Sequence, residues 1–141
     1  MPLALEAAQT IITAALAYAT ENNLKPLAVV VLDARGALKA FAAQDGTSLK
    51  RGEIALGKAN GALGLGMGSR ALMARAEQQP YFIAAATAAI GGSLIPVPGG
   101  VLIREDGAII GAAGISGETS DNDEAAAKAG IFAAGFTADG G

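Results

Sequence analysis

The residues best suited to chemistry in this chain are one lysine and two carboxylates that lie far apart in the sequence. Lys58 falls inside the mainly apolar stretch IALGKANGA (54–62), which predicts a largely buried helix. A buried lysine has a lowered pKa and can act as a base, but it can equally be an ion-paired structural cation. Asp45, in a Gln-Asp-Gly turn, and Glu124, in an acidic cluster, are the other candidate bases. Asp45 could pair with Arg51 or with Lys58.

Two glycine-containing segments are candidate ligand contacts. Gly99 and Gly100 precede a predicted strand, where the lack of side chains lets a ligand or another backbone approach closely. Their amides, with those of Ser116 and Gly117, could receive an anion; a simple bend in the sheet is the structural alternative. Arg70 stands at a predicted helix start, which the helix dipole disfavours, so either an anionic partner or solvent exposure must explain it.

The acidic cluster DNDE contains oxygen ligands of the kind that hard metal ions prefer. It lacks the glycine and the distal glutamate of a calcium-binding loop, and it opens an alanine-rich helix, where the dipole favours acids. Asp121 with Glu124, or Ser120 with Asp123, has the spacing of a capping box. We therefore predict helix capping here and no metal site.

Composition excludes several classes of protein. The chain has no cysteine and no histidine, which excludes disulfides, cysteine nucleophiles, histidine-based triads and the commonest haem ligand. A net charge of −3 and a pI near 4.8 argue against a nucleic-acid partner. Apolar residues never run for the 18 or more positions that a membrane span needs. The N-terminus MPLALEAAQ lacks the positive region of a secretion signal, so we expect a cytoplasmic protein without membrane contact.

Hairpin-connected strands predict the α+β class with an antiparallel sheet. Asp106-Gly107 between two apolar runs is a strong type I′ hairpin signal, and near-continuous apolar strands indicate that both faces of the sheet are covered. We expect one domain, 1–141, with a frayed tail at 137–141. The expected helices are 3–22, 49–60, 69–77, 80–88 and 121–134. The expected strands are 27–32, 37–42, 94–97, 101–104 and 108–115.

Several of these segments resemble one known family. The stretches PGGVLIR, IIGAAGISG, DNDEAAAKAGI, VVVLDARGALKAFAAQDG and IALGKANGA are similar to motifs of the GlcG/HbpS-like family, also called the haem-degrading domain family. Its members include single-domain proteins and the C-terminal domain of one type of corrinoid adenosyltransferase. The resemblance implies a profilin-like architecture, a five-stranded antiparallel sheet with helices on both faces. It also implies a homo-oligomer and a lysine at the position of Lys58.

The resemblance also raises haem as a cofactor. Some family members bind haem through a histidine of the N-terminal helix, and this chain has none. The substitutes would be Tyr18, Tyr81, Met67 or Met73. Tyr18 is the best placed of them, because it falls on the predicted first helix. No cofactor is therefore certain, and haem stays open.

Two functions follow from these observations. The first is a small-molecule-binding or accessory protein whose ligand, a carboxylate-bearing organic molecule or a tetrapyrrole, lies between Lys58, the Gly99-Gly100 turn and the 116–124 corner. The alternative is a small lyase or isomerase that moves a proton beside a carbonyl. Its base would be Lys58, Asp45 or Glu124, with glycine amides stabilising the oxyanion.

Overall fold

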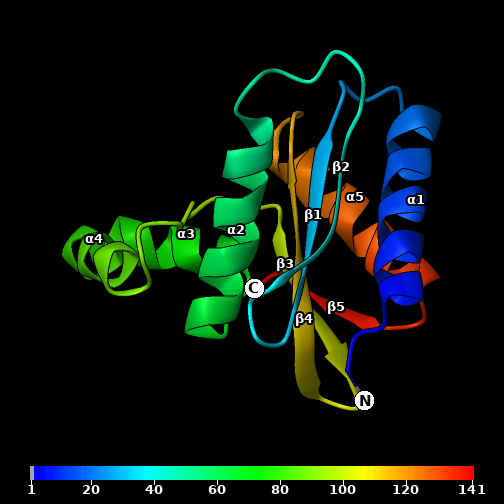
Figure 1. Ribbon diagram of the computed structural model, residues 1–141. Helices are drawn as coiled ribbons and strands as arrows, with labels where there is room; N and C mark the ends of the chain where they lie inside the picture. Colours follow the sequence, from blue (N-terminus) through cyan, green and yellow to red (C-terminus); the bar gives the residue numbers. More distant parts are fainter. Residues whose placement is uncertain (1) are drawn as a thin grey trace.

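The computed structural model of the protein describes residues 2–141 and arranges them around a five-stranded antiparallel sheet (Figure 1). The order across the sheet is β2 (Leu38–Ala43), β1 (Ala28–Asp33), β4 (Ala108–Ser116), β3 (Gly100–Glu105) and β5 (Thr137–Asp139). Every neighbouring pair is antiparallel. The predicted α+β class and five-stranded antiparallel sheet are therefore confirmed.

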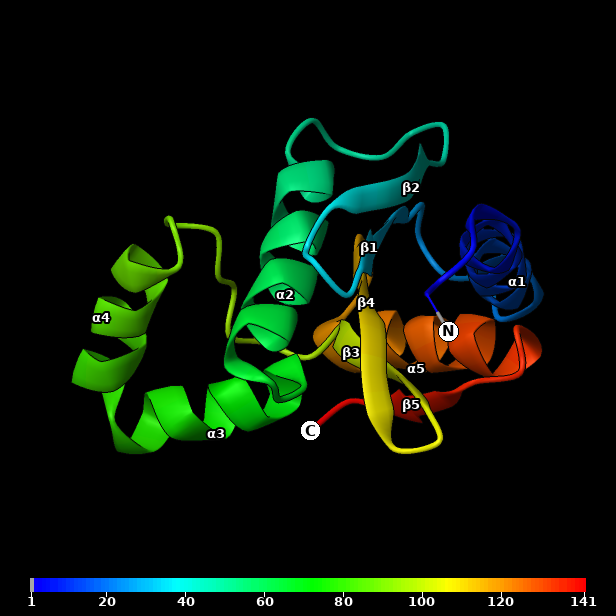
Figure 2. The same ribbon diagram turned by 60° about the horizontal axis from the view of Figure 1, so that its bottom comes forward.

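Helices cover both faces of the sheet, as its apolar strands require. Helix α2 (Arg51–Leu65) packs on one face, and α1 (Leu5–Glu21) and α5 (Ser120–Ala133) pack on the other (Figure 2). Every residue of β1 is buried. Because side chains alternate along a strand, Val29 joins the core on the α1–α5 side, whereas Val30 joins the core on the α2 side.

Helices α3 (Ser69–Gln78) and α4 (Pro80–Ala89) form an arm that projects from the body beyond α2 (Figures 1 and 2). A small apolar cluster attaches the arm, and its buried members are Leu72, Ile83 and Leu94. The outer side of α4 faces solvent.

The turn between β3 and β4 has the predicted geometry. Asp106 and Gly107 have φ angles of 51° and 82°, and a type I′ turn requires φ > 0 at both positions. The hairpin prediction is confirmed.

The expected strand at 94–97 is wrong. This segment lies along α2 instead, where Ile95 donates its backbone N–H to the Gly57 carbonyl at 3.1 Å. Gly57 and Gly61 leave room for it, since a Cβ there would lie 2.6 Å from Ile95 Cγ1 and 2.8 Å from Leu94 Cγ. Helix α2 also runs past its expected end at 60 and closes on Gly66, whose φ is 71°.

The expected frayed tail at 137–141 is also wrong. Strand β5 pairs with β3, and Arg104 Nε donates to Asp139 Oδ2 at 2.9 Å. Ala138 packs against the main core, and the Gly140 carbonyl accepts the backbone N–H of Arg70 at 3.2 Å. A strand of three residues is too short to show alternation in the sequence, so only its contacts reveal it.

Candidate functional site

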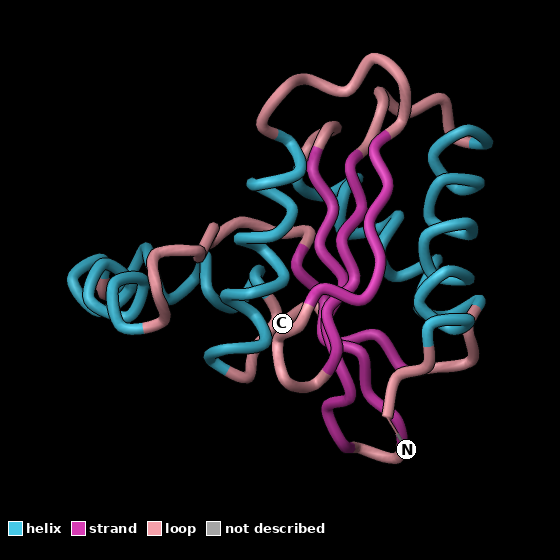
Figure 3. The backbone as a smooth tube through the Cα atoms, in the orientation of Figure 1, coloured by secondary structure: helices cyan, strands magenta, loops and turns pink. Residues whose placement is uncertain are grey.

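The loops at one end of the sheet bring together the sequence segments expected to form a site. Ala28 at the start of β1 pairs with Ala43 at the end of β2 and with Ser116 at the end of β4. The connection from β2 to α2 passes over this end (Figure 3). Lys58 on α2 contacts the Ile115 carbonyl near the end of β4 and Asp123 in the first turn of α5.

Lys58 is a buried, ion-paired residue. Its side chain is 2% exposed, and its Nζ donates to Asp123 Oδ2 at 3.0 Å and to the Ile115 carbonyl at 2.9 Å. The partner of this lysine is Asp123, not Asp45. Burial lowers the pKa of Lys58 and raises the pKa of the Asp123 carboxyl. The pair joins α2 to α5 around the end of the sheet.

Gly99 and Gly100 seat Lys58 against the sheet. A Cβ on Gly99 would lie 2.9 Å from Lys58 Nζ, and a Cβ on Gly100 would lie 2.2 Å from the Lys58 carbonyl oxygen. The Gly100 amide donates to Ser69 Oγ at 2.7 Å. These glycines therefore permit close packing of helix and strand, and the Gly100 amide is already engaged within the protein.

Arg70 finds its anionic partners on α5. Its Nε and Nη2 donate to the two carboxylate oxygens of Glu124 at 3.1 and 3.3 Å, and Nη2 also pairs with Asp121. These hydrogen bonds raise the pKa of Arg70. Lys128 Nζ lies 3.4 Å from Glu124 as well. Glu124 is thus enclosed by two cations rather than held free as a base.

The capping box predicted at Asp121 and Glu124 is wrong. Thr119 is the N-cap of α5, and its hydroxyl accepts the Asn122 N–H at 3.2 Å. Asp123 accepts the backbone N–H of Glu118 at 2.9 Å. Asp121 and Glu124 bind Arg70 because α3 presents that guanidinium beside the first turn of α5.

Arg51 defines a small cavity at the loop end, which we call the Arg51 pocket. Its Nη1 donates to Ser116 Oγ at 3.1 Å and its Nε to Ser48 Oγ at 3.3 Å. Because Gly117 has no side chain, the backbone can pass close to Pro26; a Cβ on Gly117 would lie 2.1 Å from the Pro26 carbonyl oxygen. The pocket has a volume of about 250 Å³ and is lined by Lys25, Pro26, Gly46, Thr47, Ser48, Arg51 and Gly117.

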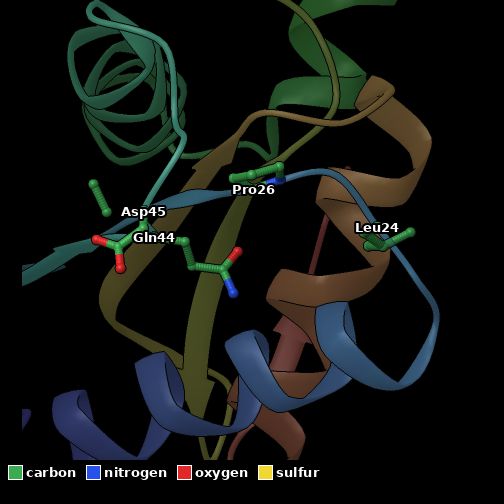
Figure 4. A pocket seen from close by; sticks show the side chains of 5 residues that line it. Leu24, Pro26, Gln44 and Asp45 are labelled. Atoms are coloured by element: carbon green, nitrogen blue, oxygen red, sulfur yellow. The ribbon is translucent and has the colours of Figure 1, made fainter.

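Asp45 lines a second, more open depression. Figure 4 shows it beside Gln44 on the loop after β2, with Leu24 and Pro26 on the segment before β1. The depression has a volume of about 520 Å³, and Pro26 borders both it and the Arg51 pocket. The Gln44 side chain is held in place because its Oε1 accepts the backbone N–H of Leu27 at 2.8 Å. Neither Lys58 nor Glu124 lines this depression, so the three candidate bases are dispersed.

The four side chains considered as haem ligands do not come together in this structure. Tyr18 is half-buried and packs against the core, and Tyr81 is 71% exposed on the arm. Met67 packs within the cluster that attaches the arm, and Met73 lies on α3. None of these four side chains lines the Arg51 pocket or the Asp45 depression.

Two further findings concern residues 2–141. None of their helices is long and apolar enough to cross a membrane. They contain no group of three or more histidine, cysteine, aspartate or glutamate side chains arranged to hold a metal ion.

Sequence reasoning missed Arg51 as a site residue and Asp123 as the partner of Lys58. The Ser48–Arg51 contact has a local signal, a hydroxyl three residues before a cation. The contacts of Arg51 with Ser116 and of Lys58 with Asp123 have none, because their partners meet only when β4 and α5 reach the end of α2.

The fold and this loop-end site define an α+β protein with a covered antiparallel sheet and a small, cation-lined pocket. Residues 3–132 match the profile of the family described as "Haem degrading protein HbpS-like". The chain belongs to this HbpS-like family.

Solved structures agree with this assignment. The PduOC:heme complex is 25% identical, with a TM-score of 0.84 and coverage of 94% of this chain and 95% of that one. The Klebsiella pneumoniae protein ORFY is 26% identical, with a TM-score of 0.84 and coverages of 94% and 90%. HbpS is 27% identical, with a TM-score of 0.81 and coverages of 94% and 89%. No curated protein matches the chain by sequence.

Proposed function

We propose that this protein is a small-molecule-binding accessory protein whose ligand carries carboxylate groups, with a tetrapyrrole among the candidates. The observation that carries the proposal is membership of the HbpS-like family, together with similarity over nearly the whole chain to a structure described as a heme complex. The cation-lined Arg51 pocket supports a carboxylate ligand. We also propose a cytoplasmic location.

Binding has more support than the lyase or isomerase alternative. A general base must reach the proton that it removes. Lys58 is enclosed by its contacts with Asp123 and Ile115, and Glu124 is paired with Arg70 and Lys128. Asp45 is exposed and lies apart from both.

A haemin titration of the purified protein, followed by absorption spectroscopy, tests the proposal. We expect a saturable change with a sharp Soret band at one haemin per chain. Tyr18→Phe should leave the spectrum unchanged, because Tyr18 packs against the core; the matched control is Tyr81→Phe on the arm. A broad change that does not saturate would contradict tetrapyrrole binding and direct the search to smaller organic acids.

We also propose that the protein is a homo-oligomer that associates through α4. This helix contains no charged residue, and Tyr81 and four alanines on its outer side are exposed. A helix that is apolar on all sides is usually buried, and a two-fold contact between uncharged faces creates no repulsion between like charges.

Sedimentation analysis tests the self-association. Wild type should sediment as an oligomer, and Ala85→Glu, which places a charge on the exposed side of α4, should shift it toward the monomer. Ala17→Glu, at an exposed position of α1, is the matched control and should not. A monomeric wild type would contradict the proposal.

A further inference from the structure

Arg51 differs from every other arginine in its surroundings. Arg35, Arg70 and Arg104 each pair with carboxylates, and Arg75 stacks 4.1 Å from the centre of the Phe82 ring. Within residues 2–141, no carboxylate forms an ion pair with Arg51, although this residue is half-buried. Its positive charge is therefore not neutralised by direct contact.

Neutral hydroxyl groups hold this cation in place. A guanidinium has five N–H donors. In Arg51, the N–H of Nε donates to Ser48 Oγ, and one N–H of Nη1 donates to Ser116 Oγ. The remaining N–H donors of Nη1 and Nη2 have no hydrogen-bond partner within residues 2–141. Because Ser116 is fully buried at the end of β4, the guanidinium is anchored to the sheet and needs little reordering to bind.

The rest of the lining has the same electrostatic character. Lys25 adds a second positive charge, and none of the lining residues is an aspartate or glutamate. Glu118 lies close to Lys25 in the chain fold, and its carboxylate accepts the backbone N–H groups of Lys25 and Thr119 at 2.8 and 3.1 Å. These bonds, and to a smaller extent the charge of Lys25, lower the pKa of Glu118.

We propose that the Arg51 pocket is a carboxylate-binding subsite in which Arg51 and Lys25 hold the acid group of the ligand. This inference rests on the proposed function, because it says which part of the protein receives the ligand's carboxylate. At roughly 30 Å³ per water molecule, the pocket holds a carboxylate with a short chain rather than a whole tetrapyrrole. A larger ligand would extend past Pro26 into the Asp45 depression.

The carboxylate could come from a free dicarboxylic acid or from a tetrapyrrole side chain, and three probes distinguish these sources. Succinate represents the free acid, haemin carries the acid on a tetrapyrrole, and haemin dimethyl ester lacks the acid. Each is titrated into wild type, Arg51→Gln and Lys50→Gln by calorimetry, with the Arg51 Nε–H signal followed by NMR. Lys50→Gln removes the same charge one residue away from the lining.

A charged hydrogen bond contributes about 1.5–3 kcal/mol, so Arg51→Gln should weaken the acid-bearing probe that binds by about tenfold or more. Lys50→Gln should change its affinity less than threefold. If haemin is the ligand, the dimethyl ester should bind wild type as weakly as haemin binds Arg51→Gln. Binding of succinate alone, with the same dependence on Arg51, would support the subsite and contradict the tetrapyrrole.

The inference would be overturned if Arg51→Gln bound haemin and succinate as wild type does. Equal affinities of wild type for haemin and for haemin dimethyl ester would also exclude this subsite, but they would not contradict the proposed function. If neither acid shifts the Arg51 Nε–H signal, the pocket is not a carboxylate site.

Discussion

The buried pair of Lys58 and Asp123 connects the two helical layers. Lys58 uses two of its three N–H donors, on Asp123 and on the Ile115 carbonyl, and Asp123 also accepts from Glu118. Desolvation penalises both charges, which is why burial lowers one pKa and raises the other. Such a pair contributes little net stability, but losing one member leaves a buried charge without a partner.

We predict that Lys58→Met lowers the free energy of unfolding at pH 7 by about 3–5 kcal/mol, as measured by urea denaturation. The double variant Lys58→Met/Asp123→Leu should regain most of this loss, because it removes the stranded carboxylate. A loss below about 1 kcal/mol in the single variant would show that the pair is not the constraint described here.

The cost of Lys58→Met should also depend on pH. Without the lysine, the raised pKa of Asp123 should rise further, so the folded state binds a proton more tightly than the unfolded state. The contribution of this carboxyl to the stability of the variant is then fully present below its unfolded pKa and is lost as pH rises through its folded pKa. Denaturation at pH 4 and pH 7 should show the smaller deficit at pH 4; an equal deficit would contradict this account.

At the scale of the element, the three glycines of α2 beyond its first turn differ in their packing: two make tight contacts and one makes a loose contact. Gly57 and Gly61 press against Ile95 and Leu94, whereas a Cβ on Gly64 would lie 3.6 Å from the nearest atoms of Ile90. Glycine weakens a helix interior, so its presence there needs a packing reason. Of these three glycines, only Gly57 and Gly61 have one.

We therefore predict opposite effects of the same substitution along α2. Gly57→Ala should lower the melting temperature, because its methyl group would lie 2.6 Å from Ile95 Cγ1. Gly64→Ala should raise the free energy of unfolding by roughly 0.5–1 kcal/mol, the usual helix-interior gain. Calorimetry of both variants is the test, and changes of the same sign would contradict the packing described.

Local signals explain which elements the sequence predicts well. Asp106-Gly107 predicted the β3–β4 turn, and the apolar run of β1 predicted that this strand is buried on both faces of the sheet. The errors arose where tertiary contacts override local pattern: segment 94–97 looks like a strand but lies along α2, and segment 137–139 looks like a tail but completes the sheet.

The candidate site was predictable in part for the same reason. Lys58 stood out as a cation in an apolar helix, and Arg70 stood out as a cation at a helix start that either an anionic partner or solvent exposure had to explain. The identity of each partner was not readable, because Asp123 and Glu124 approach from α5, more than fifty positions away. Which cation stays free for a ligand therefore depends on the completed fold.

At the scale of the whole molecule, the body and the arm differ in how they are held. Strands β1 and β4 lie between helices, and α3 has polar contacts with the body through Ser69 and Arg70, whereas α4 depends on the small cluster of Leu72, Ile83 and Leu94. Few buried apolar contacts mean a low free energy of local opening.

Amide hydrogen exchange should therefore separate two parts of the protein. We predict that, at protein concentrations low enough to give the monomer, amides of α4 exchange earliest among the helices and those of β1 and β4 exchange last, near the rate of global unfolding. If α4 mediates self-association, raising the protein concentration should slow exchange in α4 selectively. Uniform protection across body and arm would contradict this division.

The strand order also has a kinetic consequence. The β1–β2 and β3–β4 hairpins join neighbours in the chain and can form early, but the central pairing of Val30 with Gly114 closes a loop that contains α2 and the arm. Loop-closure entropy must be lost before that contact stabilises anything, which slows folding of such topologies. Gly114 also admits α2, because a Cβ there would lie 2.0 Å from the Ala55 carbonyl oxygen. We therefore expect the two hairpins to join and α2 to pack on the sheet in one late, cooperative event.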